Sequence, residues 1–259
     1  MTTMQVRIEG VGFWADGLPD WEAARAFVAE GRLPDAPPRR PAPQVLAANE
    51  RRRAPDTVTL ALVVAEAACA AAGRDPAALP SVFASTHGEL AITDHLCETL
   101  AADPLAVSPI KFHNSVHNAA AGYWTIGTGC MRAATAVSAH AATFAQGLLE
   151  AAVQCIAGNE PVLLAAYDAP ARGALGQVTR CEGLLAAALV IAPATGSGPR
   201  LTLSIAEGDV DPADGRLAAR YAGNAMAPML PLIECLASGG GPVALGAGPG
   251  LILHVEVDA

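Results

Sequence analysis

SPIKFHNSVHNAAAGYWTIGTGCMRAATAVSAHAATFAQGLLEAAVQCIAGNEPVLLAAYD, residues 108–168, is the stretch that decides the fold. At its centre a short β-favouring piece, Ala134-Thr135-Ala136-Val137-Ser138, runs into a long Ala- and Leu-rich segment with a helical period. Such an elbow places its turn residue at a helix N-terminus, where free N–H groups favour a developing negative charge. Acyl-transfer enzymes often have a nucleophilic Cys or Ser there, and this chain has Val137.

The composition predicts a layered α/β fold. A chain of 259 residues can form one large domain or two small ones. Hydrophobic residues make up 52% and charged residues 16%, which argues against disorder. The aromatic share is only 4% while alanine is abundant, so small side chains must fill the core between closely packed helices and sheet.

The charge and the cysteines exclude several classes of protein. A net charge of −9 argues against a nucleic-acid partner, because phosphate binding needs a basic face. The run Arg51-Arg52-Arg53 is the one basic cluster and is interpreted as a solvated helix start, with a contact to an acidic carrier protein as the alternative. The six cysteines, Cys69, Cys97, Cys130, Cys155, Cys181 and Cys235, show no metal-like spacing, and most of them are expected to be small core residues in a reducing compartment.

The chain shows no targeting or membrane signal. Its first residues, MTTMQVRIEG, lack a positive segment followed by an apolar core. The apolar run near Leu189 is cut by Pro193, well short of a membrane span. We therefore expect a cytoplasmic protein without a membrane span.

Hydrophobic periodicity and capping residues predict the elements in order. Helices are expected at residues 21–30, 55–72, 90–100, 115–127, 139–157 and 226–237. Strands are expected at residues 5–14, 81–85, 133–136, 161–167, 181–192, 200–206 and 250–257. Residues 33–43 hold many prolines and are predicted to form an irregular arm on the surface of the chain or of a partner, or a plain linker.

The histidines are weighed as ligands or bases and given structural interpretations. His113 and His117, four residues apart, lack the glutamate of a metalloprotease and a third ligand, so no metal and no cofactor are expected. His87 follows a predicted strand and is interpreted as a turn histidine bonded to backbone. Ser138 and His140 point to different sides of a helix start, which disfavours a dyad. Ser138 is instead predicted to cap the helix 139–157.

The central stretch resembles the nucleophile region of the β-ketoacyl-acyl-carrier-protein synthases, members of the thiolase superfamily. The resemblance rests on Asn118-Ala-Ala-Ala-Gly122 followed by Thr125-Ile126, then on Ala134-Thr135-Ala136, and on the helix and strand that end at Gly158 and Tyr167. It implies a thiolase-like layered fold. In this register Val137 occupies the position of the nucleophilic cysteine.

The stretch FHNSVHNAAAGYW is similar to the short ketosynthase-like proteins called chain length factors, found in aryl polyene and xanthomonadin-type pigment pathways. The resemblance covers about residues 55–192. It implies a single β-ketoacyl synthase-like domain, residues 1–259, with an N-terminal half at 1–192 and a strongly abridged C-terminal half at 200–259. A complete ketosynthase carries two histidines in its second half; here Asn224 takes the place of one and the other has no counterpart.

The resemblance also implies where this chain meets a partner. The strand before the nucleophile position pairs with its counterpart across a dimer axis in this superfamily, and the preceding helix lies nearby. The expected interface and tunnel residues are Asn114, His117, Asn118, Tyr123, Trp124, Ala134, Thr135, Ala136, Val137 and Ser138. The Tyr123-Trp124 pair has an ordinary core interpretation beside that of shaping an acyl tunnel.

Three functions follow as hypotheses. The first is a non-catalytic chain length factor, a pseudoenzyme that forms a heterodimer with a complete β-ketoacyl-ACP synthase and limits polyene, polyketide or fatty-acid-like chain growth on an acyl carrier protein with a phosphopantetheine-bound acyl chain. Valine neither ionises nor accepts an acyl group, so condensation would rest on the partner. The second is an independent acyltransferase or thioesterase. The third is a homodimeric acyl-binding scaffold.

Overall fold

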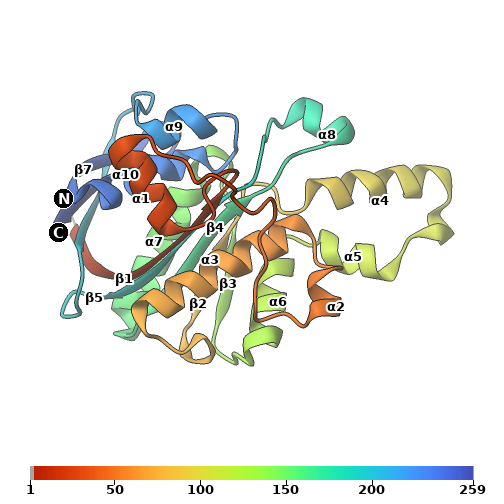
Figure 1. The fold of residues 1–259 in the computed structure, drawn as a ribbon, viewed down its shortest axis with the longest axis horizontal. Coiled ribbons are helices and arrows are strands. Elements are labelled where there is room, and N and C mark those ends of the chain that lie inside the picture. The colour runs from red at the N-terminus through yellow and green to blue at the C-terminus, as the bar shows by residue number, and fades with distance from the viewer. Residues whose placement is uncertain (1–2, 259) are drawn as a thin grey trace.

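A computed structural model describes residues 3–258, in which one eight-stranded sheet has the order β3-β2-β4-β5-β1-β6-β8-β7 (Figure 1). The strands are β1 (Thr3–Ala15), β2 (Ser81–Ala84), β3 (Ala134–Val137), β4 (Val162–Asp168), β5 (Leu185–Pro193), β6 (Arg200–Glu207), β7 (Gly240–Gly248) and β8 (Leu251–Asp258). β2 runs parallel to β3 and β4, and the other neighbours pair antiparallel.

Helices cover both faces of this sheet (Figure 1). They are α1 (Trp21–Glu30), α2 (Ala48–Arg51), α3 (Asp56–Ala72), α4 (Leu90–Ala102), α5 (Pro109–Ser115), α6 (Ala119–Thr128), α7 (Thr143–Gly158), α8 (Gly173–Val178), α9 (Arg216–Tyr221) and α10 (Leu230–Ser238). Side chains of α3 and α6 share one buried cluster with the strands, and those of α1, α7, α9 and α10 share another. This arrangement confirms the predicted layered α/β fold.

The central strands are buried on both faces, as their continuous apolar sequences predict. All of β4 is buried, and so is β5 as far as Ala192. Alternate residues supply the two clusters: Leu164 belongs to one and Leu163 to the other. At Gly12, and likewise at Gly10, a Cβ would collide with the backbone of α3, so these glycines allow the helix to lie directly against β1.

Several predicted helix bounds are wrong because of local turns. The helix predicted at 115–127 begins only at Ala119, as α6, because Ser115 ends a separate helix, α5, which the sequence did not predict. The helix predicted at 139–157 begins only at Thr143, after a short 3-10 turn, His140–Ala142. The helix predicted at 226–237 likewise begins later, at Leu230, after a 3-10 turn.

The C-terminal part contains more regular structure than the sequence predicts. Between β6 and β8 the chain forms α9, α10 and β7, of which only α10 was expected. β7 forms a hairpin with β8 and lies at the end of the sheet. The three strands β6, β8 and β7 extend the sheet of the N-terminal part beyond β1.

The proline-rich residues 33–43 contain neither helix nor strand. The segment that follows is fastened to α3, because Glu66 accepts hydrogen bonds from the backbone N–H groups of Gln44 and Val45. Arg51 lies at the end of α2 and donates to the Pro43 carbonyl at 3.1 Å. The basic run therefore lies at a helix end, which corrects its interpretation as a helix start.

Candidate functional site

Val137 is the last residue of β3, at the elbow that leads to α7. Its side chain is half-buried and packs against the larger apolar cluster. The next turn contains His140 with φ +51°, a conformation that few residues other than glycine adopt. The elbow predicted from the sequence is thus present, with an apolar side chain where a nucleophile would stand.

Ser138 does not cap α7, which corrects the prediction. Its hydroxyl donates to the carbonyl of Thr86 at 2.9 Å and so joins the elbow to the loop after β2. The start of α7 is held by Thr143 instead. The Thr143 hydroxyl accepts from the Ala139 N–H at 2.9 Å and donates to the His140 carbonyl at 2.7 Å.

Asp168 is a buried carboxylate at the end of β4, adjacent to the end of β2. Its Oδ1 accepts from the Ser85 hydroxyl at 2.7 Å and from the Thr86 N–H at 3.1 Å. No ion pair to Asp168 is present among residues 3–258. Burial raises the pKa of this carboxyl, although the bonds from Ser85 and Thr86 oppose the shift. The ends of β2 and β4 are thus joined by one carboxyl group.

Asn224 lies in the loop after α9, and its amide is fully engaged in hydrogen bonds. Nδ2 donates to the carbonyls of Glu182 at 3.0 Å and Gly183 at 2.9 Å. Oδ1 accepts from the Met226 N–H at 2.9 Å. The side chain is therefore a buried link between the C-terminal part and the segment before β5, with no free polar group for chemistry.

His113 and His117 do not share a helix, because α5 ends between them. His117 donates from Nε2 to the Ser85 carbonyl at 2.8 Å. The His113 ring lies 6.0 Å from the ring of Tyr123. Among residues 3–258 no three His, Cys, Asp or Glu side chains are grouped so that they could hold a metal ion.

The predicted interface residues divide between the core and the surface. Trp124 is fully buried, and its ring packs 6.4 Å from that of Phe83. Tyr123 is half-buried and donates to Asn114 Oδ1 at 3.0 Å. Asn118 is exposed where α6 begins, and its side chain makes no capping bond.

β3 is an edge strand with an open outer side. The bonds from Ser81 N–H to Ala133 and from Ser85 N–H to Val137 face β2. Backbone groups alternate along a strand, so those of Ala134 and Ala136 point away from the sheet. Both of these alanines are exposed, whereas Thr135 accepts from Gln154 Nε2 at 3.0 Å.

Large apolar side chains lie exposed on the elements that flank β3 on both faces of the sheet. They are Ile126 on α6, Met131 in the loop before β3, and Val153 and Ile156 on α7. Met131 is 94% exposed and Ile126 78% exposed. An open strand edge between two apolar flanks is the arrangement of a surface that pairs with another chain.

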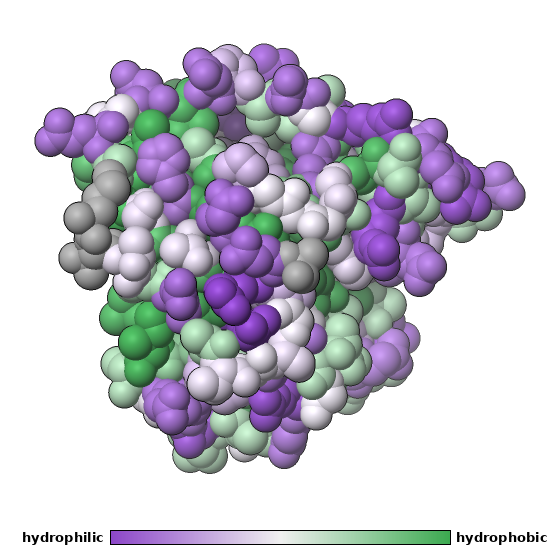
Figure 2. Space-filling view, turned by 90° about the vertical axis from the view of Figure 1, so that its left-hand side faces the viewer, coloured by the Kyte–Doolittle hydropathy of each residue, from purple (hydrophilic) through white to green (hydrophobic). Residues whose placement is uncertain are grey.

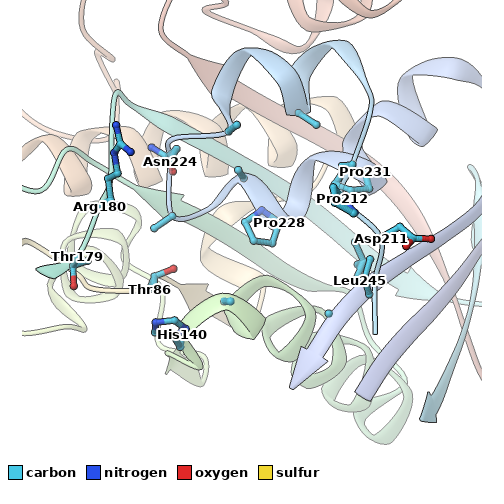
Figure 3. A pocket seen from close by; sticks show the side chains of 18 of the residues that line it. Thr86, His140, Thr179, Arg180, Asp211, Pro212, Asn224, Pro228, Pro231 and Leu245 are labelled. Carbon is cyan, nitrogen blue, oxygen red and sulfur yellow. The ribbon is translucent and has the colours of Figure 1, made fainter. Parts of the chain in front are cut away.

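A cavity of about 680 Å³ lies beside the elbow, and no residue of β3 lines it (Figure 3). It brings together Thr86 and His87 after β2, His140 at the elbow, Val178 at the end of α8 and the loop around Asn224. Of the residues singled out from the sequence as interface, tunnel or replaced catalytic positions, Asn224 alone is among its lining residues. Sequence analysis missed the cavity, although Thr86 and His87 at the carboxyl end of a buried strand were a signal for it.

His87 is the half-buried histidine of this cavity. Burial lowers the pKa of its imidazole, and His140 and His117 add to that shift, while the charge of Asp168 opposes it. These surroundings therefore favour the neutral form of the imidazole.

No helix in residues 3–258 is long and apolar enough to cross a membrane.

Comparison with known proteins agrees with this geometry. Residues 21–245 match the family model described as the N-terminal domain of β-ketoacyl synthase. No curated protein matched the chain.

Many solved structures are similar to this chain, and three of them are similar over nearly its whole length. The ketosynthase ApeO in complex with its chain length factor ApeC from Xenorhabdus doucetiae has a TM-score of 0.72 at 21% identity, covering 99% of this chain and 97% of the other. The ishigamide ketosynthase/chain length factor has a TM-score of 0.70 at 15% identity, covering 98% and 99%. AntDE:AntF, an acyl-carrier protein in complex with its ketosynthase bound to the hexaketide, has a TM-score of 0.74 at 12% identity, covering 100% of both.

These likenesses confirm the thiolase-like fold predicted from the central stretch. The match to the family model covers most of the chain, including the elbow, the edge strand and the loop of Asn224. The chain belongs to the family of β-ketoacyl synthase N-terminal domains.

Proposed function

We propose that this protein is a non-catalytic chain length factor. It pairs with a complete β-ketoacyl-ACP synthase, contributes to the acyl tunnel at the shared interface and limits the growth of a polyene or related acyl chain. The acyl carrier protein delivers the growing chain to the partner, whose cysteine and histidines carry out the condensation.

One observation carries the proposal: Val137 ends an open edge strand at the elbow where an acyl-transfer enzyme needs a nucleophile. Condensation by a synthase requires a thiolate to hold the acyl chain and donors to stabilise the enolate. A valine side chain supplies neither. The chain therefore keeps the frame of the site without the group that would react.

The polar groups behind the elbow support a structural role. Ser138 is committed to the Thr86 carbonyl, and Asn224 to two carbonyls and one N–H. Side chains held in this way stabilise the carboxyl ends of the strands. None of them is free to replace the missing nucleophile.

The open edge of β3 is the feature that supports the proposed pairing with a partner. A homologous synthase of the same fold would present a similar strand edge, and two such edges can pair backbone to backbone. The exposed side chains of Ile126, Met131 and Ile156 would then be covered on both sides of the joint. Two of the three structures described above are a ketosynthase together with a chain length factor, which agrees with this proposal.

The test is a condensation assay with acyl- and malonyl-carrier protein and a complete synthase from the same organism. The chain alone and its Val137→Cys variant should form no ketoacyl product, because the cysteine would lack the two histidines. Adding the wild-type chain to the synthase should produce condensation and set the length of the product.

A ketoacyl product formed by the Val137→Cys variant alone would contradict the pseudoenzyme account. Release of free acid from acyl thioesters by the wild-type chain alone would instead favour the independent acyltransferase or thioesterase. Product lengths that do not change when the chain is added to the synthase would contradict the proposed control of length.

A further inference from the structure

A short strap, residues 41–47, connects two of the helices that cover the sheet. It contains neither helix nor strand, and its first side chains alternate: Pro41 and Pro43 are buried, whereas Ala42 is exposed. Leu46 is buried in the same cluster as the side chains of α3 and α6. The strap is therefore packed into the molecule along one side and is not a loose linker.

Glu66 on α3 fixes the strap in place. Its carboxylate accepts from the Gln44 N–H at 2.9 Å and from the Val45 N–H. Hydrogen bonds to an ionised acceptor are stronger than those between neutral groups, and two of them on one carboxylate fix both the position and the direction of the strap. The two prolines lack an N–H and have little conformational freedom to lose, so this part of the strap needs few other bonds.

The strap also touches the last turn of α6. A Cβ on Gly127 would lie 2.8 Å from Cγ2 of Val45 and 3.2 Å from its carbonyl oxygen, so this glycine allows the strap to approach the helix. A Cβ on Gly122, earlier in the same helix, would meet nothing within 4 Å. Of these two glycines, only the one in the last turn lies against the strap.

That last turn of α6 belongs to the proposed partner surface. Ile126 immediately precedes Gly127, and Met131 follows in the loop before β3. The helix packs on β2 and β3 as well as on α3. A shift of its last turn would therefore move both apolar side chains relative to the β3 edge, because a closely packed interior transmits such shifts.

We propose that the strap positions the α6 flank of the β3 edge, with Glu66 and Gly127 as positioning residues. Glu66 holds the strap on α3, and the strap holds the last turn of α6 at the place from which Ile126 meets the partner. This inference rests on the proposed pairing with a synthase and adds the part of the chain that prepares the surface for it. Glu66 acts only through the strap.

The experiment compares Glu66→Ala with Glu50→Ala. Both variants remove one negative charge near Arg51, but within residues 3–258 only the Glu66 carboxylate accepts bonds from the strap. In Glu66→Ala we expect faster hydrogen exchange in residues 44–47 and 119–128 and about tenfold weaker binding to the synthase, with an unchanged circular dichroism spectrum. Glu66→Gln keeps one acceptor oxygen and should lie between Glu66→Ala and the wild type. Glu50→Ala should behave as the wild type in both measurements.

Gly127→Ala tests the strap from the side of the helix. The added Cβ would collide with Val45 while Glu66 stays intact, and alanine is the better helix former. We expect a similar loss of affinity, about tenfold, because the strap is forced away from α6. Val45→Ala in the same chain removes the colliding Cγ2 and should restore most of the affinity. Wild-type affinity in Gly127→Ala, or no recovery in the double variant, would overturn the proposal.

The two measurements separate this inference from the proposed function. Wild-type exchange in α6 of Glu66→Ala, or wild-type affinity for the synthase despite faster exchange, would overturn the role of the strap. A wild-type chain that binds no synthase would contradict the proposed function instead. Hydrogen exchange is measured on the chain alone, so it would still decide whether the strap holds α6.

Discussion

The two edges of the sheet are built in opposite ways. β3 at one edge has four residues, outward-facing backbone groups and exposed apolar side chains on both flanks. β7 at the other edge contains Pro242 and several glycines. In Figure 2, which views the molecule from the side of β7, hydrophilic side chains are interspersed with apolar ones over this face.

This difference indicates which edge of the sheet can pair with a further strand and which edge cannot. Proline and glycine in an edge strand discourage pairing with a further strand, and β7 has both. β3 has neither, and its apolar flanks would be unfavourable in water unless covered. The molecule thus protects one edge and leaves the other open, in agreement with the proposed pairing with one synthase.

The largest effect should come from charging the flanks of β3. Ile126→Glu combined with Met131→Glu places two charges where apolar contact with the partner is proposed. We expect the affinity for the synthase to fall by about 100-fold or more, as at a buried hot spot. Both residues are largely exposed in the isolated chain, so its melting temperature should change little.

The matched control is Val178→Glu, since Val178 is 81% exposed on α8, away from β3. This variant should assemble normally with the synthase in a pull-down or in analytical ultracentrifugation. Equal loss of binding in both variants, or in neither, would remove the distinction between the two edges.

A smaller effect should follow from making β3 resemble β7. Ala134→Pro removes an N–H that points away from β2 at the first residue of the strand, where proline is tolerated. We expect about tenfold weaker assembly, the loss of roughly one hydrogen bond, with the circular dichroism spectrum unchanged. Assembly at full strength would show that β3 does not pair with the partner through its backbone.

Changes behind the open edge should alter stability and leave assembly intact. Asn224→Ala would leave the carbonyls of Glu182 and Gly183 without this donor and the Met226 N–H without its acceptor. We expect the free energy of unfolding to fall by about 2–3 kcal/mol in urea titrations. A wild-type free energy of unfolding would contradict the structural role of this amide.

The smallest effect concerns pH. Burial raises the pKa of Asp168 above its ordinary value of 3.8, so its contribution to stability is fully present below that value and is lost as pH rises through the raised pKa. Asp168→Asn should remove this part of the decline in unfolding free energy as the pH rises above 3.8, measured by urea titrations at a series of pH values. The exposed Asp35→Asn variant is the control and should retain the wild-type decline.

Elements with local signals were predicted well from the sequence. α1 has the predicted bounds because Asp20 caps its start and Gly31 ends it with φ +72°. α3 follows Pro55 and ends at Gly73 with φ +62° for similar reasons. Caps and stops of this kind depend on a few neighbouring residues and can therefore be recognised in the sequence.

Features that depend on distant contacts were missed. β7 is rich in glycine and contains Pro242, a composition that is typical of a loop, and it becomes a strand through its ladder with β8. The start of α7 is displaced by the positive φ of His140, which the alanine-rich sequence conceals. The cavity unites His87 with His140 and Asn224, and periodicity within one segment cannot reveal such a meeting.

Native mass spectrometry of the chain, purified gently from its own host, tests the central claim most directly. The account predicts a one-to-one complex with a complete β-ketoacyl-ACP synthase, lost when Ile126 and Met131 are both changed to Glu and retained in Val178→Glu. A homodimer or a monomer with no synthase bound would contradict it.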